Sequence, residues 1–135
     1  MAQRPVVLIA DDETFILNVL DLKFSGGGYE VLRADDGEEA LEIARLRSPD
    51  LVITDYQMPR LDGLSLARRL AAHPATSQTP VLMLTARGAR LTSAELVGTR
   101  VAQMISKPFS PREVLAQSDA LLAAHRGPPR EVATA

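Results

Sequence analysis

Polar residues that can bind a metal ion or a phosphoryl group follow four short apolar segments of the chain. The pair Asp11 and Asp12 comes after one segment, Asp55 after another, Thr85 after a third and Lys107 after the last. Carboxylates, a hydroxyl and an ammonium group suit phosphoryl transfer, which depends mainly on positioning and charge stabilisation. If the fold brings these groups together, one carboxylate is expected to act as the nucleophile while Thr85 and Lys107 bind the outer phosphoryl oxygens.

A cation is expected at the same place. Three carboxylates in one crevice would repel one another strongly unless a positive charge lies among them. Oxygen ligands in this number suit Mg²⁺, a hard divalent ion that proteins bind through carboxylates and phosphate groups. The sequence therefore predicts Mg²⁺ as a cofactor that offsets the carboxylate charge.

The elements that must position these residues alternate along the chain. Apolar, β-branched runs predict strands at Val6–Ala10, Leu51–Thr54 and Val81–Leu84, with weaker candidates at Tyr29–Arg33 and Val101–Ser106. Between them, apolar residues recur with helical periodicity. The pattern predicts an α/β fold, a doubly wound five-stranded parallel sheet with helices on both faces. Sites in such sheets form beyond the carboxyl ends of the strands.

Capping residues mark where two of the helices begin. Asp36 with Glu39 three residues later predicts an acidic first turn and a capping box at the second helix. Ser110 as N-cap, Pro111 at the first helical position and Glu113 as the reciprocal partner predict the start of the last helix.

Two other segments are less regular. Residues 91–97 predict a fourth helix, although its apolar face is thin. The run Gly26–Gly28 is predicted to end the first helix and to turn into a strand. A phosphate-binding glycine loop has the opposite order, since it follows a strand and opens a helix.

Composition limits the class of protein. The chain has 135 residues, of which 46% are apolar and 24% charged, as in an average globular domain. A formal net charge of −2 with dispersed arginines argues against direct binding to nucleic acid, and the lack of cysteine excludes disulfides and thiolate metal sites. No apolar stretch is long enough for a signal peptide or a membrane span, so a cytoplasmic protein is expected. We predict one domain over residues 1–126 and a flexible tail over residues 127–135.

Taken in order, these motifs resemble the response-regulator receiver family of two-component signalling, and the resemblance covers about residues 5 to 125. The segments that carry it are Asp11-Asp12, Asp55-Tyr56-Gln57-Met58-Pro59 with Asp62-Gly63, Thr85-Ala86, and Lys107-Pro108-Phe109. The match is chemotaxis-regulator-like, with a single apparent domain. It implies a flavodoxin-like strand order, 2-1-3-4-5.

The resemblance also assigns roles to residues. It implies that Asp55 is the phosphorylation site, and that Asp11, Asp12, Asp55 and the backbone carbonyl of Gln57 hold Mg²⁺ directly or through water. The backbone of Ala86 is expected to contact the phosphoryl group. Such a chain is not an enzyme, beyond assisting its own phosphorylation and dephosphorylation.

The resemblance further implies a cis peptide bond between Lys107 and Pro108 and a switch formed by Thr85 and Met104. The family usually carries an aromatic residue three positions before the lysine, where this chain has Met104. Methionine is flexible and can fill gaps, but it has no ring to reorient. Phosphorylation is expected to change the surface over residues 91–124.

The expected partners are a sensor histidine kinase or a histidine phosphotransfer protein, and a downstream protein of unknown identity. Neither nucleic acid nor a membrane is an expected direct partner, and the chain is expected to be a monomer or a weak dimer. Three alternatives remain: a phosphorylation-independent pseudo-receiver, an aspartyl-phosphate phosphatase and a flavin-binding module. Against the phosphatase, Gln57 stands where a second carboxylate would act as general acid. Against the flavin module, residues 11–14 are acidic where a flavin phosphate needs donors.

Overall fold

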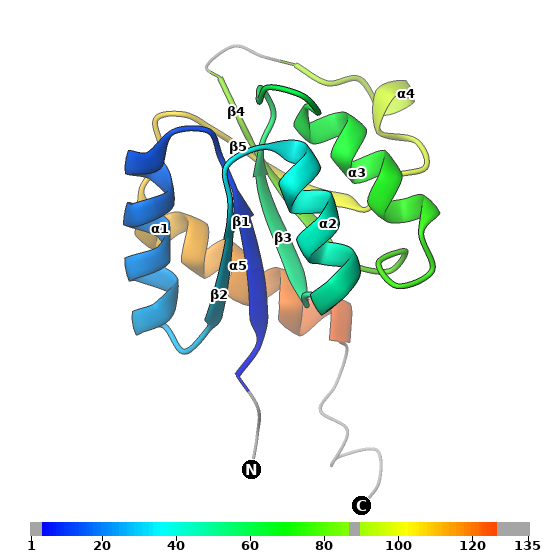
Figure 1. Cartoon of the computed structure of the whole chain (residues 1–135). Helices are drawn as coiled ribbons and strands as arrows, with labels where there is room; N and C mark the ends of the chain where they lie inside the picture. The colour runs from blue at the N-terminus through cyan, green and yellow to red at the C-terminus, as the bar shows by residue number, and fades with distance from the viewer. Residues whose placement is uncertain (1–3, 87–89, 127–135) are drawn as a thin grey trace, which may run out of the picture.

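One parallel sheet forms the centre of the molecule (Figure 1). The computed structural model describes residues 4–86 and 90–126, so the predicted tail and its boundary with the domain lie outside the described residues. The strands are ordered β2-β1-β3-β4-β5, which confirms the predicted fold class and strand order. Their bounds are β1 Val6–Ala10, β2 Glu30–Ala34, β3 Leu51–Asp55, β4 Val81–Thr85 and β5 Val101–Ser106.

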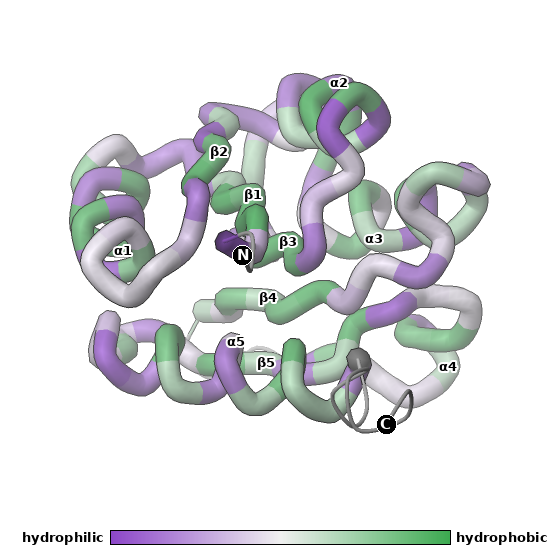
Figure 2. The backbone as a smooth tube through the Cα atoms, turned by 90° about the horizontal axis from the view of Figure 1, so that it is seen from below, coloured by the Kyte–Doolittle hydropathy of each residue, from purple (hydrophilic) through white to green (hydrophobic). Residues whose placement is uncertain are grey.

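Helices cover both faces of this sheet. In the view along the sheet, α1 and α5 lie on one face, and α2 and α3 lie on the other (Figure 2). The helices are α1 Thr14–Gly26, α2 Gly37–Arg47, α3 Gly63–Ala72, α4 Ser93–Leu96 and α5 Pro111–Arg126. Among the described residues, no helix combines the length and apolarity that crossing a bilayer would require.

The central strands contribute side chains to two hydrophobic cores. Ile9 and its neighbours on one face pack with α1 and α5, whereas Leu8 and the residues that alternate with it pack with α2 and α3. All five residues of β3 and of β4 are buried, which explains their continuous apolar character. Burying a leucine or isoleucine side chain contributes about 1.5–3 kcal/mol, so these strands anchor the residues at their carboxyl ends.

The predicted helix starts are confirmed, with one correction at each. The carboxylate of Asp36 accepts a hydrogen bond from Glu39 N at 2.8 Å, but Glu39 Oε1 accepts from Asp35 N and not from the cap itself. The long glutamate side chain reaches one residue beyond the cap. At α5, Ser110 Oγ accepts from Glu113 N at 3.4 Å, and the described contacts give the Glu113 side chain no return bond to the cap.

The fourth helix is shorter than predicted. It covers Ser93–Leu96 instead of residues 91–97 and begins with a capping box between Thr92 and Glu95. None of its residues is buried. Since most helices gain their stability by burying an apolar face, a segment without one does not extend beyond its cap.

The glycine run ends α1 as predicted. Gly27 N donates to Lys23 O at 3.0 Å, and Gly28 has φ 95°, a conformation that other residues rarely adopt. Tyr29 N then donates to Phe24 O at 3.0 Å, so Tyr29 lies in the turn that caps α1. For this reason β2 begins one residue later than predicted, at Glu30.

Candidate functional site

The polar residues that follow the strands converge at one edge of the sheet. Asp11 follows β1, Asp55 ends β3, Thr85 ends β4 and Lys107 follows β5. The parallel register aligns these ends, with Asp55 opposite Leu84 and Thr85 opposite Ser106. Lys107 N also donates to Thr85 O at 2.7 Å, which ties β5 to β4 at this edge. The predicted convergence is confirmed.

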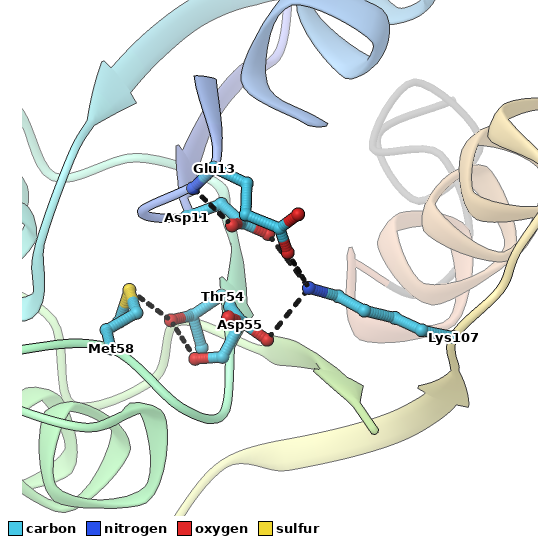
Figure 3. Close-up of polar contacts among 6 residues, drawn as sticks. All are labelled: Asp11, Glu13, Thr54, Asp55, Met58 and Lys107. Carbon is cyan, nitrogen blue, oxygen red and sulfur yellow. Dashed lines mark hydrogen bonds and ion pairs between the residues drawn. The ribbon is translucent and has the colours of Figure 1, made fainter. Parts of the chain in front are cut away.

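Lys107 lies among three carboxylates (Figure 3). Its Nζ is 3.3 Å from Asp55 Oδ1, 3.5 Å from Asp11 Oδ2 and 3.2 Å from Glu13 Oε1. Glu13 was not predicted as a site residue. Its position directly after the acidic pair is a weak signal, because a glutamate there is equally compatible with a solvated side chain at the start of α1.

Three of the acidic residues fit a hard divalent cation. Ligand oxygens of Asp11, Asp12 and Asp55 all lie within 4.8 Å of one another. Asp11 is fully buried, and its Oδ1 accepts a hydrogen bond from Glu13 N at 2.9 Å. Its Oδ2 accepts no hydrogen bond from the residues described here, which suits an oxygen available to a metal ion. The donor set consists of oxygen alone, as Mg²⁺ prefers.

Burial and neighbouring charges shift the titration of these groups. Burial raises the pKa of Asp11 to about 6, with the Glu13 N–H acting to lower it and the Asp55 charge to raise it. Burial also raises the pKa of Asp55, against the lowering effect of Lys107. For Lys107, burial acts to lower the pKa, but the charges of Asp11 and Asp55 outweigh it and raise the pKa above its ordinary value. Lys107 is therefore a firmly charged ammonium beside two carboxyl groups, Asp11 and Asp55, whose pKa values burial raises.

The other predicted site residues lie on the same edge or next to it. Thr85 is buried, with 3% of its surface exposed, whereas Met104 on β5 is 37% exposed. Gln57 and Ala86 are exposed in the loops after β3 and β4. Their roles in metal binding, phosphoryl contact and switching stay predictions. The Lys107–Pro108 bond is cis, as the resemblance implied.

Gly63 packs closely against the backbone of Asp55 and Tyr56. It is the first residue of α3, and its N–H donates to Tyr56 O at 2.8 Å. A Cβ at this position would lie 2.4 Å from Asp55 O and 3.0 Å from Tyr56 Cα, closer than van der Waals contact permits. Only glycine lets α3 start this close to the residue at the centre of the site.

We therefore expect Gly63→Ala to destabilise the protein by about 1–3 kcal/mol, the usual range for overpacking, because backbone atoms must move apart. Urea denaturation followed by circular dichroism measures the change. Gly26→Ala is the matched control, since a Cβ there meets nothing within 4 Å and should leave stability nearly unchanged. Equal midpoints for Gly63→Ala and the wild type would contradict the close approach.

Comparisons with known proteins point to one protein family. A family model described as the response regulator receiver domain matches residues 7–119. The alkaline phosphatase synthesis transcriptional regulatory protein PhoP of Bacillus subtilis is 37% identical over 86% of this chain and 48% of its own length. A probable transcriptional regulator, ycf27 of Cyanophora paradoxa, is 42% identical over 86% of this chain and 47% of its length. The chain thus spans about half the length of the curated relatives it matches.

Solved structures share the whole fold. A putative response regulator from Chloroflexus aurantiacus has a TM-score of 0.81 and 36% identity, covering 90% of this chain and 99% of that one. The chemotaxis response regulator CheY4 of Vibrio cholerae has a TM-score of 0.80 and 29% identity, covering 87% and 98%. Because the family model matches most of this chain, the chain belongs to the response regulator receiver domain family.

Proposed function

We propose that the chain is a phospho-acceptor switch in which Asp55 takes a phosphoryl group from a histidine kinase or a histidine phosphotransfer protein. The observation that carries this proposal is the position of Asp55. One of its carboxylate oxygens lies within 4.8 Å of oxygens of Asp11 and Asp12, and its Oδ1 is 3.3 Å from Lys107 Nζ. A carboxylate oxygen of Asp55 forms a bond to phosphorus, and the bond from phosphorus to the donor atom breaks. The electron pair of that bond leaves with the donor.

Each neighbouring group has a part in this reaction. A bound Mg²⁺, held by Asp11, Asp12 and Asp55 with the carbonyl of Gln57, would neutralise charge on the incoming phosphoryl oxygens. Lys107 already stands at the acceptor and donates to a phosphoryl oxygen without having to lose a proton. The Thr85 hydroxyl, at the end of the adjacent strand, binds another of these oxygens.

The phosphorylated state acts on other proteins. A phosphoryl group on Asp55 replaces the single carboxylate charge with a group that carries about −1.5 to −2 charge at the sheet edge, and it biases the loops around it. The loop after β4 and the strand β5 connect this edge to the surface over residues 91–124, which a downstream protein reads. Several relatives bear names that describe transcriptional regulators, which supports an output of this regulatory kind. The chain itself turns over no substrate.

The reaction can be tested without knowing the kinase. The wild-type chain is incubated with a small acyl phosphate, with Mg²⁺ or with excess chelator, and its intact mass is followed. One added phosphoryl group in the presence of Mg²⁺ and none with chelator is the expected result. No labelling under either condition would favour the pseudo-receiver alternative. Metal-dependent, multiple-turnover release from a generic phosphoester would favour the phosphatase.

A further inference from the structure

The contact between Glu13 and Lys107 has no evident structural purpose. Glu13 occupies the N-cap position of α1, where a side chain normally accepts hydrogen bonds from the first helical N–H groups. Its side chain makes no such bond, and its Oε1 lies instead 3.2 Å from Lys107 Nζ. These two residues are 94 positions apart in the chain, so the fold brings them together specifically.

An ammonium group has only three N–H donors, and Lys107 Nζ is in contact with three carboxylates. The contact with Asp11 Oδ2 is an ion pair and not a hydrogen bond, so a phosphoryl oxygen on Asp55 competes with Glu13 for the ammonium group. Asp11 and Asp55 are buried and cannot replace a lost cation with water. The Glu13 side chain is 59% exposed and lies on a groove of about 700 Å³ that opens to solvent, so water can replace Lys107 there.

We propose that Glu13 restrains Lys107 in the resting state and must release it when Asp55 is phosphorylated. Glu13 is thus a positioning residue that slows the reaction by stabilising the state before phosphoryl transfer. The inference rests on the proposed phosphorylation of Asp55 and adds a regulatory contact to it. Any partner that withdraws Glu13 from Lys107 would speed the transfer.

The kinetic test uses two substitutions with different chemistry. Glu13→Gln removes the charge, whereas Glu13→Asp keeps the charge but shortens the side chain and favours the helix N-cap. We expect both variants to be labelled by a small acyl phosphate with a maximal rate about two- to fivefold above wild type, the range for releasing an exposed ion pair. The donor concentration at half-maximal rate should not change. Glu42→Gln, which removes an exposed carboxylate on α2, is the control and should react like wild type.

A second measurement needs no phosphodonor. Lys23 and Lys107 are the only lysines in the chain, so carbon-13 labelling of lysine gives two side-chain signals. Lys107 Nζ lies 3.2 Å from Glu13 Oε1, so Glu13→Gln should move the Lys107 side-chain signal, with the Lys23 signal as the internal reference. An unaltered Lys107 signal would show that the restraint does not exist in solution.

The outcomes separate this inference from the proposed function. Labelled wild type together with Glu13 variants that react no faster would overturn the restraint and leave the acceptor role intact. If Glu13→Gln instead lowers the half-saturating donor concentration while Glu13→Asp behaves like wild type, Glu13 merely repels the anionic donor, and the restraint is wrong. Wild type that accepts no phosphoryl group overturns both.

Discussion

Asp55→Asn is expected to accept no phosphoryl group under conditions that fully label the wild-type chain. An amide is not a nucleophile toward phosphorus, and no second carboxylate replaces Asp55 at the end of β3. The fold should survive the change, because burial already disfavours the charged form of Asp55 and raises its pKa. Intact mass measured after incubation with a small acyl phosphate and Mg²⁺ gives the result directly.

A control separates this loss from a general effect of removing acidic residues near the site. Asp35 follows β2 and is exposed, so Asp35→Asn should be labelled like wild type. Circular dichroism of Asp55→Asn should match the wild-type spectrum. Equal labelling of Asp55→Asn and wild type would refute the acceptor, and labelling lost in both variants would show that the reaction depends on charge and not on position.

Asp11→Asn is expected to make the metal-free protein more stable while removing its response to Mg²⁺. At neutral pH the buried carboxylate of Asp11 is charged against its preference, since its pKa rises from 3.8 to about 6 on folding. One pKa unit corresponds to about 1.4 kcal/mol, so the neutral amide should increase the free energy of unfolding by on the order of 3 kcal/mol. An asparagine oxygen can still accept the hydrogen bond that Glu13 N donates to Asp11.

The effect of Asp11 on the free energy of unfolding depends on pH. The folded-state pKa of Asp11 lies above the unfolded one, so the folded protein binds a proton more tightly. Above about pH 6 the charged carboxylate of Asp11 therefore makes its full unfavourable contribution to the free energy of folding. This contribution decreases as the pH falls toward 3.8. Lys107 stays charged throughout this range. The difference in stability between Asp11→Asn and wild type should be largest at pH 7.5 and should disappear near pH 4.

Urea denaturation in chelator at several pH values measures this difference. Asp36→Ala is an informative contrast, because hydrogen bonding from Glu39 N lowers the pKa of Asp36. Removing this carboxylate should therefore destabilise the protein at pH values above the ordinary carboxyl pKa. Added Mg²⁺ should raise the midpoint of wild type but not of Asp11→Asn. If Asp11→Asn were less stable than wild type at pH 7.5 in chelator, the charged Asp11 carboxylate would not destabilise the fold, and this prediction would be wrong.

Much of the fold could be predicted from sequence because its signals are local. Continuous apolar runs mark strands buried on both faces, and β1 begins and ends where its run does. Caps depend on side chains three residues apart, so Asp36 and Ser110 marked the starts of α2 and α5. The extent of α4 was wrong because it depends on how much of the helix is buried, which a thin apolar pattern does not reveal.

By itself, the sequence determined which polar residues lie at one edge of the sheet: parallel strands place their carboxyl ends there, so Asp11, Asp55, Thr85 and Lys107 had to meet there. Only the tertiary structure decided how their charges are shared. Lys107 contacts Glu13 because the β5–α5 loop lies beside the start of α1, a pairing between distant segments that no local pattern encodes. The pKa of Asp11 likewise depends on its complete burial, which arises only when the whole core has formed.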